Sequence, residues 1–159
     1  MQAVATAVKS ELQGYADRGI FRNLTVSQSA RGEAVDFCFN WLTDSPFILR
    51  LKPGKPELEL KDVLPSVPFR SEMDRDFRHF LKARSDESVV THRRLDNARF
   101  SFSCRNRNEK LSVLIGFDNE DANAVARTAV NLLHEIFNNF LVEGPYQNYM
   151  VEVFNVPEE

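Results

Sequence analysis

Residues 98–117, ARFSFSCRNRNEKLSVLIGF, decide the fold class of this chain. Apolar and polar residues alternate in both halves of this stretch, on either side of a short polar segment. Two-residue alternation around a short loop is typical of an antiparallel β-hairpin with one buried face. A loop closed by residues 105 and 110 would place Phe102 opposite Val113. The sequence therefore predicts a hairpin that buries its phenylalanines and exposes its arginines.

The first half of the chain repeats this arrangement of a helix followed by strands. Apolar residues recur at steps of three and four over 2–17, which predicts an amphipathic helix. A short strand is expected at 24–26, and alternating residues at 35–41 predict its partner. Further strands are expected at 47–51 and 58–60.

These last two strands are expected to form a hairpin at the edge of the sheet. Lys52, Pro53 and Pro56 lie between them. Proline and lysine both disfavour pairing with a further strand, so an edge position suits this hairpin.

Three more helices are expected in the second half of the chain. Ser71 is a suitable N-cap for a helix that precedes the second hairpin. A long helix at 122–141 carries apolar residues on more than one face, which indicates deep burial. Residues 146–154 have the spacing of a short final helix, although 149, 151 and 153 also alternate as in a strand.

These elements predict a single α+β domain over residues 1–159. Its antiparallel sheet has five to six strands and its helices number three to four, in the order α-β-β-β(-β)-α-β-β-α(-α). The composition, 43% hydrophobic and 27% charged, suits a globular protein, and thirteen phenylalanines indicate a large core, an interface, or both. The first fifteen residues lack the apolar run of a signal peptide or membrane span, so a cytoplasmic location is expected.

The order of these elements resembles that of the small dimeric chaperones of bacterial secretion systems. The resemblance covers most of the chain and rests on element order, without a shared motif. It implies a homodimer that binds another protein.

No motif in the sequence indicates a catalytic or metal site. His79, His92 and His134 lack the spacing of helical metal ligands, and Cys38 and Cys104 form no CxxC unit. Both cysteines are expected to be free and buried. We therefore expect no cofactor and no metal, and an enzyme remains an alternative only with a site assembled from residues distant in sequence.

A cluster of arginines supports a second alternative, anion or nucleic-acid binding through residues 93–110. Residues 70–110 contain eleven Lys and Arg against seven Asp and Glu. Guanidinium groups match the geometry of phosphate and carboxylate. Nucleic acid is the less favoured ligand, because no outward aromatic residue offers a surface for base stacking. The candidate anion-binding residues are Arg93, Arg94, Arg99, Arg105 and Arg107.

The favoured function is a non-enzymatic protein-binding or assembly module, with the chain itself or another protein as partner. It is supported by the aromatic excess, the predicted edge hairpin and the apolar carboxyl terminus. Tyrosine, methionine and phenylalanine are enriched at contact surfaces. The candidate interface residues are Tyr146, Tyr149, Met150 and Phe154. Cys38, Ile48 and Leu114 also fall on the otherwise polar sides of their strands.

Overall fold

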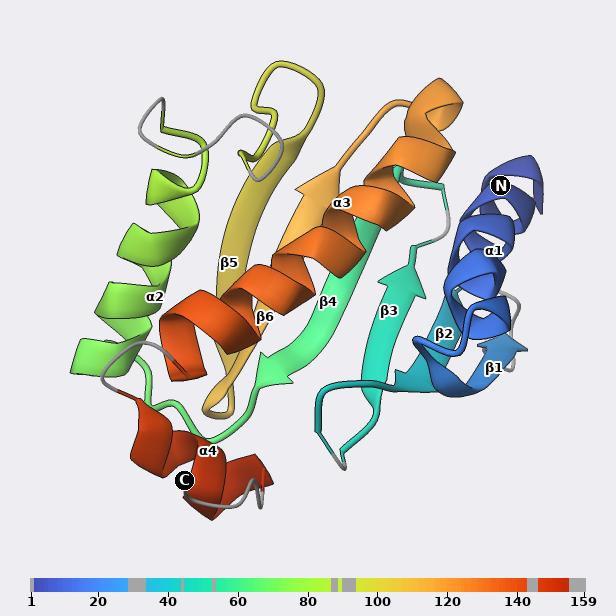
Figure 1. Cartoon of the computed structure of the whole chain (residues 1–159). Helices are drawn as coiled ribbons and strands as arrows, with labels where there is room; N and C mark the ends of the chain where they lie inside the picture. The colour runs from blue at the N-terminus through green and yellow to red at the C-terminus, as the bar shows by residue number, and fades with distance from the viewer. Residues whose placement is uncertain are drawn as a thin grey trace.

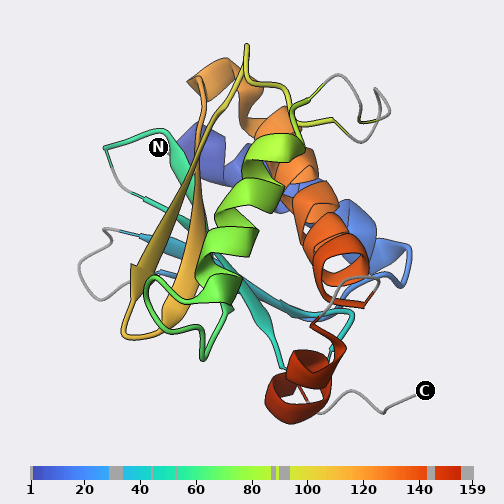
Figure 2. The same ribbon diagram turned by 90° about the vertical axis from the view of Figure 1, so that its left-hand side faces the viewer.

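The fold is a six-stranded antiparallel sheet with helices packed against one of its faces (Figure 1 and Figure 2). The computed structural model describes residues 2–28, 34–43, 45–52, 54–86, 89, 94–142 and 146–154. Its elements are α1 (Gln2–Asp17), β1 (Arg22–Gln28), β2 (Val35–Asn40), β3 (Phe47–Leu51), β4 (Glu57–Leu64), α2 (Glu72–Ala83), β5 (Ser101–Arg107), β6 (Lys110–Gly116), η2 (Asn119–Asp121), α3 (Ala122–Glu135), the π-helical η3 (Ile136–Val142) and α4 (Gln147–Phe154). The predicted α+β class and the predicted order of elements are confirmed.

The strands lie in the order β1-β2-β3-β4-β6-β5, and every neighbouring pair is antiparallel. β3 and β4 pair as the predicted hairpin, but the prediction that this hairpin lies at the edge of the sheet is wrong. β4 pairs with β6 on its far side, which places both strands in the middle of the sheet. Lys52 and Pro56 lie outside the strands, so they do not oppose this pairing. The edge strands are β1 and β5.

One row of side chains crosses all six strands and shows how the sheet builds the core. Its members, in strand order, are Val26, Phe37, Leu49, Leu60, Val113 and Cys104. The four inner members are almost completely buried, whereas Val26 on β1 is 42% exposed. Alternate residues of each strand point to the same face, so this row marks the apolar face that the helices cover.

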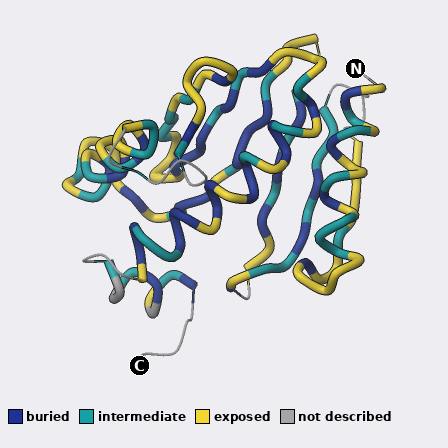
Figure 3. The backbone as a smooth tube through the Cα atoms, turned by 45° about the horizontal axis from the view of Figure 1, so that its top comes forward, coloured by how far each residue is buried: buried dark blue, intermediate teal, exposed yellow. Residues whose placement is uncertain are grey.

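α3 crosses the middle of this face, α1 covers the strands at one side of it, and aromatic contacts connect η3 to its surroundings. α3 runs diagonally across the sheet and continues directly into η3, while α1 packs beside it above β1 and β2 (Figure 1). Phe137 of η3 contacts Phe47 of β3, with ring centroids 5.2 Å apart. Phe140 contacts Phe77 of α2 at 5.3 Å. Figure 3 shows the resulting buried band along α3 and the central strands.

No described helix covers the opposite face of the sheet (Figure 2). This open face carries paired charges on the central strands. Arg50 donates two hydrogen bonds to Asp36, at 2.7 and 2.9 Å. Lys52 lies 2.9 Å from the carboxylate of Glu57.

The second hairpin has the predicted faces but a different register. Arg107 pairs with Lys110, and Phe102 lies opposite Ile115, two residues away from the predicted partner. The reason is a tighter turn, in which only Asn108 and Glu109 lie between the strands, both with positive φ angles of 53° and 64°. A shift of two residues keeps every side chain on its own face, so the pattern of burial is unchanged.

Two further predictions about helices are confirmed. The Ser71 hydroxyl accepts a hydrogen bond from the Asp74 backbone amide at 3.2 Å and caps α2. The carboxyl-terminal segment forms a helix, α4, and not a strand. No helix in the described part of the chain is long and apolar enough to cross a membrane.

Replacing Glu109 by glycine is expected to raise the free energy of unfolding by about 1 kcal/mol, because glycine lacks the steric cost of a left-handed conformation. Urea denaturation measures the difference. Glu109→Ala retains a Cβ atom and is the matched control, with little or no gain expected. An unchanged or lower denaturation midpoint for Glu109→Gly would contradict this description of the turn.

Candidate functional site

The described residues do not assemble a metal site. No group of three His, Cys, Asp or Glu side chains in this part of the chain could hold a metal ion. His79 and His134 are exposed, and His134 stacks on Trp41 with ring centroids 6.0 Å apart. His92 lies outside the described residues.

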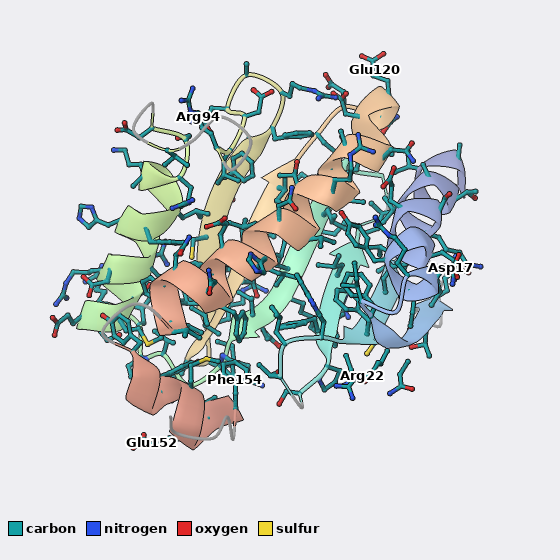
Figure 4. All side chains as sticks on the ribbon, viewed as in Figure 1. Asp17, Arg22, Arg94, Glu120, Glu152 and Phe154 are labelled. Carbon is teal, nitrogen blue, oxygen red and sulfur yellow. The ribbon has the colours of Figure 1, made fainter. Side chains whose placement is uncertain are left out.

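The predicted anion-binding arginines are divided between the two ends of β5. Arg94 lies in the segment between α2 and β5 (Figure 4), where its guanidinium donates to the Val89 carbonyl at 3.0 and 3.2 Å. Arg99 precedes β5 and forms an ion pair with Asp121 at 2.5 Å. Arg93 lies outside the described residues.

Arg99 therefore does not share a strand face with Arg105, as the sequence had predicted. β5 begins at Ser101, because Asp96 holds the preceding residues in a turn. The Asp96 carboxylate accepts hydrogen bonds from the backbone amides of Ala98 and Arg99, at 3.0 and 3.3 Å. Local hydrogen bonds of this kind compete with strand formation.

Arg105 and Arg107 lie at the opposite end of β5, beside the turn. Arg107 lies opposite Lys110, whereas the sequence had suggested that Lys110 would face Arg105. These three side chains belong to the open face of the sheet, and no ion pair joins them to any described residue. Only part of the predicted cluster is thus brought together.

The predicted interface residues of α4 are packed against the rest of the chain. Met150 and Phe154 are 4% and 5% exposed. Phe154 contacts the ring of Phe137 at 5.1 Å, and Tyr146 stacks on Phe140 at 5.0 Å. The hydroxyl of Tyr149 donates to the Pro65 carbonyl. These contacts attach α4 to the core, and a role in an interface between proteins stays a prediction.

The cysteines are free, as predicted, and both are partly buried. Cys38 and Ile48 are cross-strand neighbours on the open face of the sheet. Cys104 lies at the edge on β5, where burial raises the pKa of its thiol to about 11. A thiol with this pKa is a poor nucleophile at neutral pH.

The two edges of the sheet differ in how their backbone groups are occupied. In a two-residue hairpin the closing pair, here Arg107 and Lys110, is mutually hydrogen-bonded. Hydrogen-bonded and non-hydrogen-bonded pairs alternate along β5 and β6. The N–H and C=O groups of Phe102 and Cys104 therefore point away from β6. Arg78 of α2 donates to the Cys104 carbonyl at 3.3 Å.

The edge on β5 is therefore protected against pairing with another chain. Arg78 occupies one outward carbonyl, and α2 lies alongside the strand (Figure 1). Arg105 and Arg107 place charge on the strand itself. Charged residues on an edge strand are one of the devices by which proteins prevent strand addition.

The same alternation identifies the outward groups of β1. The Lys52 amide donates to the Glu57 carbonyl at 3.2 Å, so this pair of β3 and β4 is hydrogen-bonded. Hydrogen bonding alternates along each strand, so the registers of β2 with β3 and with β1 can be followed to the edge. They show that Thr25 and Ser27 are the residues of β1 that bond to β2. The N–H and C=O of Val26 consequently point outward from the sheet.

The edge on β1 lacks the protection found on β5. From Asn23 to Gln28 the strand carries no charged side chain, and six of its seven residues are exposed (Figure 3). A bulge between Arg22 and Thr25, with Asn23 at a φ angle of 58°, distorts only the beginning of the strand. No described segment pairs with its outer side.

Exposed apolar side chains also gather at this edge. Ile20 precedes β1 and Leu42 follows β2, at the end where Arg22 pairs with Asn40. With Val26, they are three of the five exposed large hydrophobic side chains among the described residues. Strand β1 with Ile20 and Leu42, here called the β1 edge, is the candidate functional site.

Sequence analysis missed the β1 edge because it placed the sheet edge at β3 and β4. A signal was present, since residues 23–28 form an uncharged run with β-branched residues in a chain that is 27% charged. Comparison of the chain with family models, with curated proteins and with solved structures finds no match.

All three tyrosines are expected to resist ionisation in the folded protein. Burial is the main cause of the raised pKa of Tyr15, Tyr146 and Tyr149, and a hydrogen bond to Asp76 adds to the effect at Tyr146. A pKa raised by folding stabilises the folded state below the unfolded pKa of about 10, and this stabilisation is lost as the pH rises through the folded values.

Ultraviolet titration of tyrosinate measures this effect. At about pH 10, where free tyrosine is half ionised, the native protein should show little tyrosinate absorbance, and unfolding in urea should restore it. The difference between the titrations of the wild-type protein and Tyr149→Phe gives the part of the tyrosinate absorbance that comes from Tyr149. Normal titration of all three tyrosines in the folded protein would contradict the packing of α4 described above.

Proposed function

We propose that this chain is a non-enzymatic protein-binding or assembly module that acts as a homodimer. The observation that carries the proposal is the contrast between the two edges of the sheet. The edge on β5 has a carbonyl bonded by Arg78 and two arginines on the strand, whereas the β1 edge has exposed apolar side chains and carries no charge from Asn23 to Gln28. Proteins that do not use an edge for pairing normally protect it.

Association at the β1 edge has a physical driving force of two kinds. Pairing with another strand satisfies outward backbone groups such as those of Val26. Burying Ile20, Val26 and Leu42, which are 39%, 42% and 42% exposed, removes apolar surface from water.

The resemblance in element order to the small dimeric secretion chaperones of bacteria agrees with this proposal. A cytoplasmic location is part of it, as expected for a protein of that class. The alternative of anion or nucleic-acid binding has weaker support, because Arg94 and Arg99 are engaged at the far end of β5 from Arg105 and Arg107. For an enzyme with a dispersed site, the described residues offer no metal-binding group of side chains as support.

Light scattering behind size exclusion should give a molar mass twice that of the 18.3 kDa chain. Replacing both Ile20 and Leu42 by asparagine should weaken the dimer, because it removes apolar contact area, and asparagine tolerates the positive φ angle of 66° at Leu42. Circular dichroism verifies that the variant remains folded.

The matched control replaces Phe69 and Val142, the two exposed hydrophobic residues away from the β1 edge, by asparagine. This control should retain the mass of the wild-type protein. A wild-type mass equal to one chain at every concentration tested would refute the homodimer.

A further inference from the structure

We infer that the partner of β1 is β1 of a second copy, paired antiparallel about a two-fold axis that passes midway between the two Val26 residues. The two six-stranded sheets would then join into one continuous sheet. This inference rests on the proposed function and names the partner and geometry of the same site. An interface of this kind is isologous, because both chains contribute the same surface.

Symmetry and backbone geometry favour an axis at Val26. A two-fold axis perpendicular to the sheet makes the paired strands antiparallel and leaves the helices of both copies on the same face. In that arrangement the outward Val26 N–H donates to the carbonyl of the partner's Val26, and the reciprocal bond is identical. A single residue with two outward groups therefore supplies both bonds at the axis.

The side chains around this axis are compatible with self-pairing. Val26 lies opposite the partner's Val26, so two partly exposed apolar side chains cover one another on the helix side. Thr25 lies opposite the partner's Ser27, so two hydroxyl-bearing side chains meet on the open face. Among the paired residues 24–28 of the two copies no like charges meet, although each chain carries a net charge of −3.

The part of β1 that pairs regularly with β2 is also the part that would pair with the second copy. The bulge ends at Thr25, and from Thr25 to Gln28 the strand keeps a continuous register with β2. By contrast, self-pairing at the other edge would have to displace Arg78 from the Cys104 carbonyl and bring the arginines of two β5 strands together. The β1 edge is therefore the more suitable one for a second copy.

A cysteine introduced at the axis tests this geometry directly. Val26→Cys is made in a background with Cys38→Ser and Cys104→Ser, so that only the new thiol can react. The Cα atoms of a hydrogen-bonded antiparallel pair lie about 5.5 Å apart, within the range that a disulfide spans. Mild oxidation should convert most of the protein into a covalent dimer on a non-reducing gel.

Ser103→Cys in the same background is the matched control, because Ser103 is exposed on the protected edge strand β5. It should stay largely uncrosslinked at the same protein concentration. Equal crosslinking of both variants would show random collision and would overturn the inference.

A proline at the axis provides a second, independent test. The Val26 amide points away from β2, so Val26→Pro leaves the internal ladder intact while removing a donor from the interface. We expect the dissociation constant of the dimer to rise about tenfold or more, which corresponds to about 1.4 kcal/mol. Circular dichroism should remain that of the folded chain.

The outcomes separate this inference from the proposed function. A dimer that persists in Val26→Pro and fails to crosslink through Val26→Cys would overturn the β1 interface while leaving the homodimer in place. A wild-type protein that is monomeric by light scattering would overturn both. Selective crosslinking at residue 26 together with weakened association of Val26→Pro supports the inference.

Discussion

The fold depends on the two-residue alternation of its strands, which gives the sheet one apolar face and one polar face. The row from Val26 to Cys104 shows this most clearly, because its inner members, Phe37, Leu49, Leu60 and Val113, are almost inaccessible to solvent. α1 and α3 cover this face, and their buried side chains join those of the strands in one apolar core. The helices can occupy only one side, so the polar face and the two edges are left as the surfaces available for function.

The two edges are chemically different although both end the same row. At Cys104 the outward carbonyl accepts a hydrogen bond from Arg78, and α2 lies beside the strand. At Val26 no hydrogen bond from a described side chain reaches the outward groups, and β1 carries no charge after Arg22. An open antiparallel sheet exposes unpaired backbone groups at both ends, and each end must be hydrated, covered or paired. In the described part of this chain, one end has a bonded carbonyl and two arginines on its strand, whereas the strand at the other end is uncharged from Asn23 to Gln28.

Local patterns predicted the elements well, because alternation and helical spacing depend on neighbouring residues. They could not predict strand order, since the pairing of β4 with β6 joins segments separated by α2 and β5. The hairpin register was missed by two residues, because such a shift leaves every side chain on its own face. Arg99 was misplaced because Asp96 forms a local turn that the alternation does not reveal. The apolar spacing at 146–154 predicted a helix correctly, and the structure adds that its aromatic side chains contact the core.

Amide hydrogen exchange at Val26, followed as the protein concentration is raised, tests the central claim most directly. The account predicts that the Val26 amide becomes increasingly protected as dimers form, while the outward Cys104 amide on β5 keeps a constant exchange rate. The account would be contradicted if the Val26 amide exchanged at the same rate in the monomeric and dimeric states.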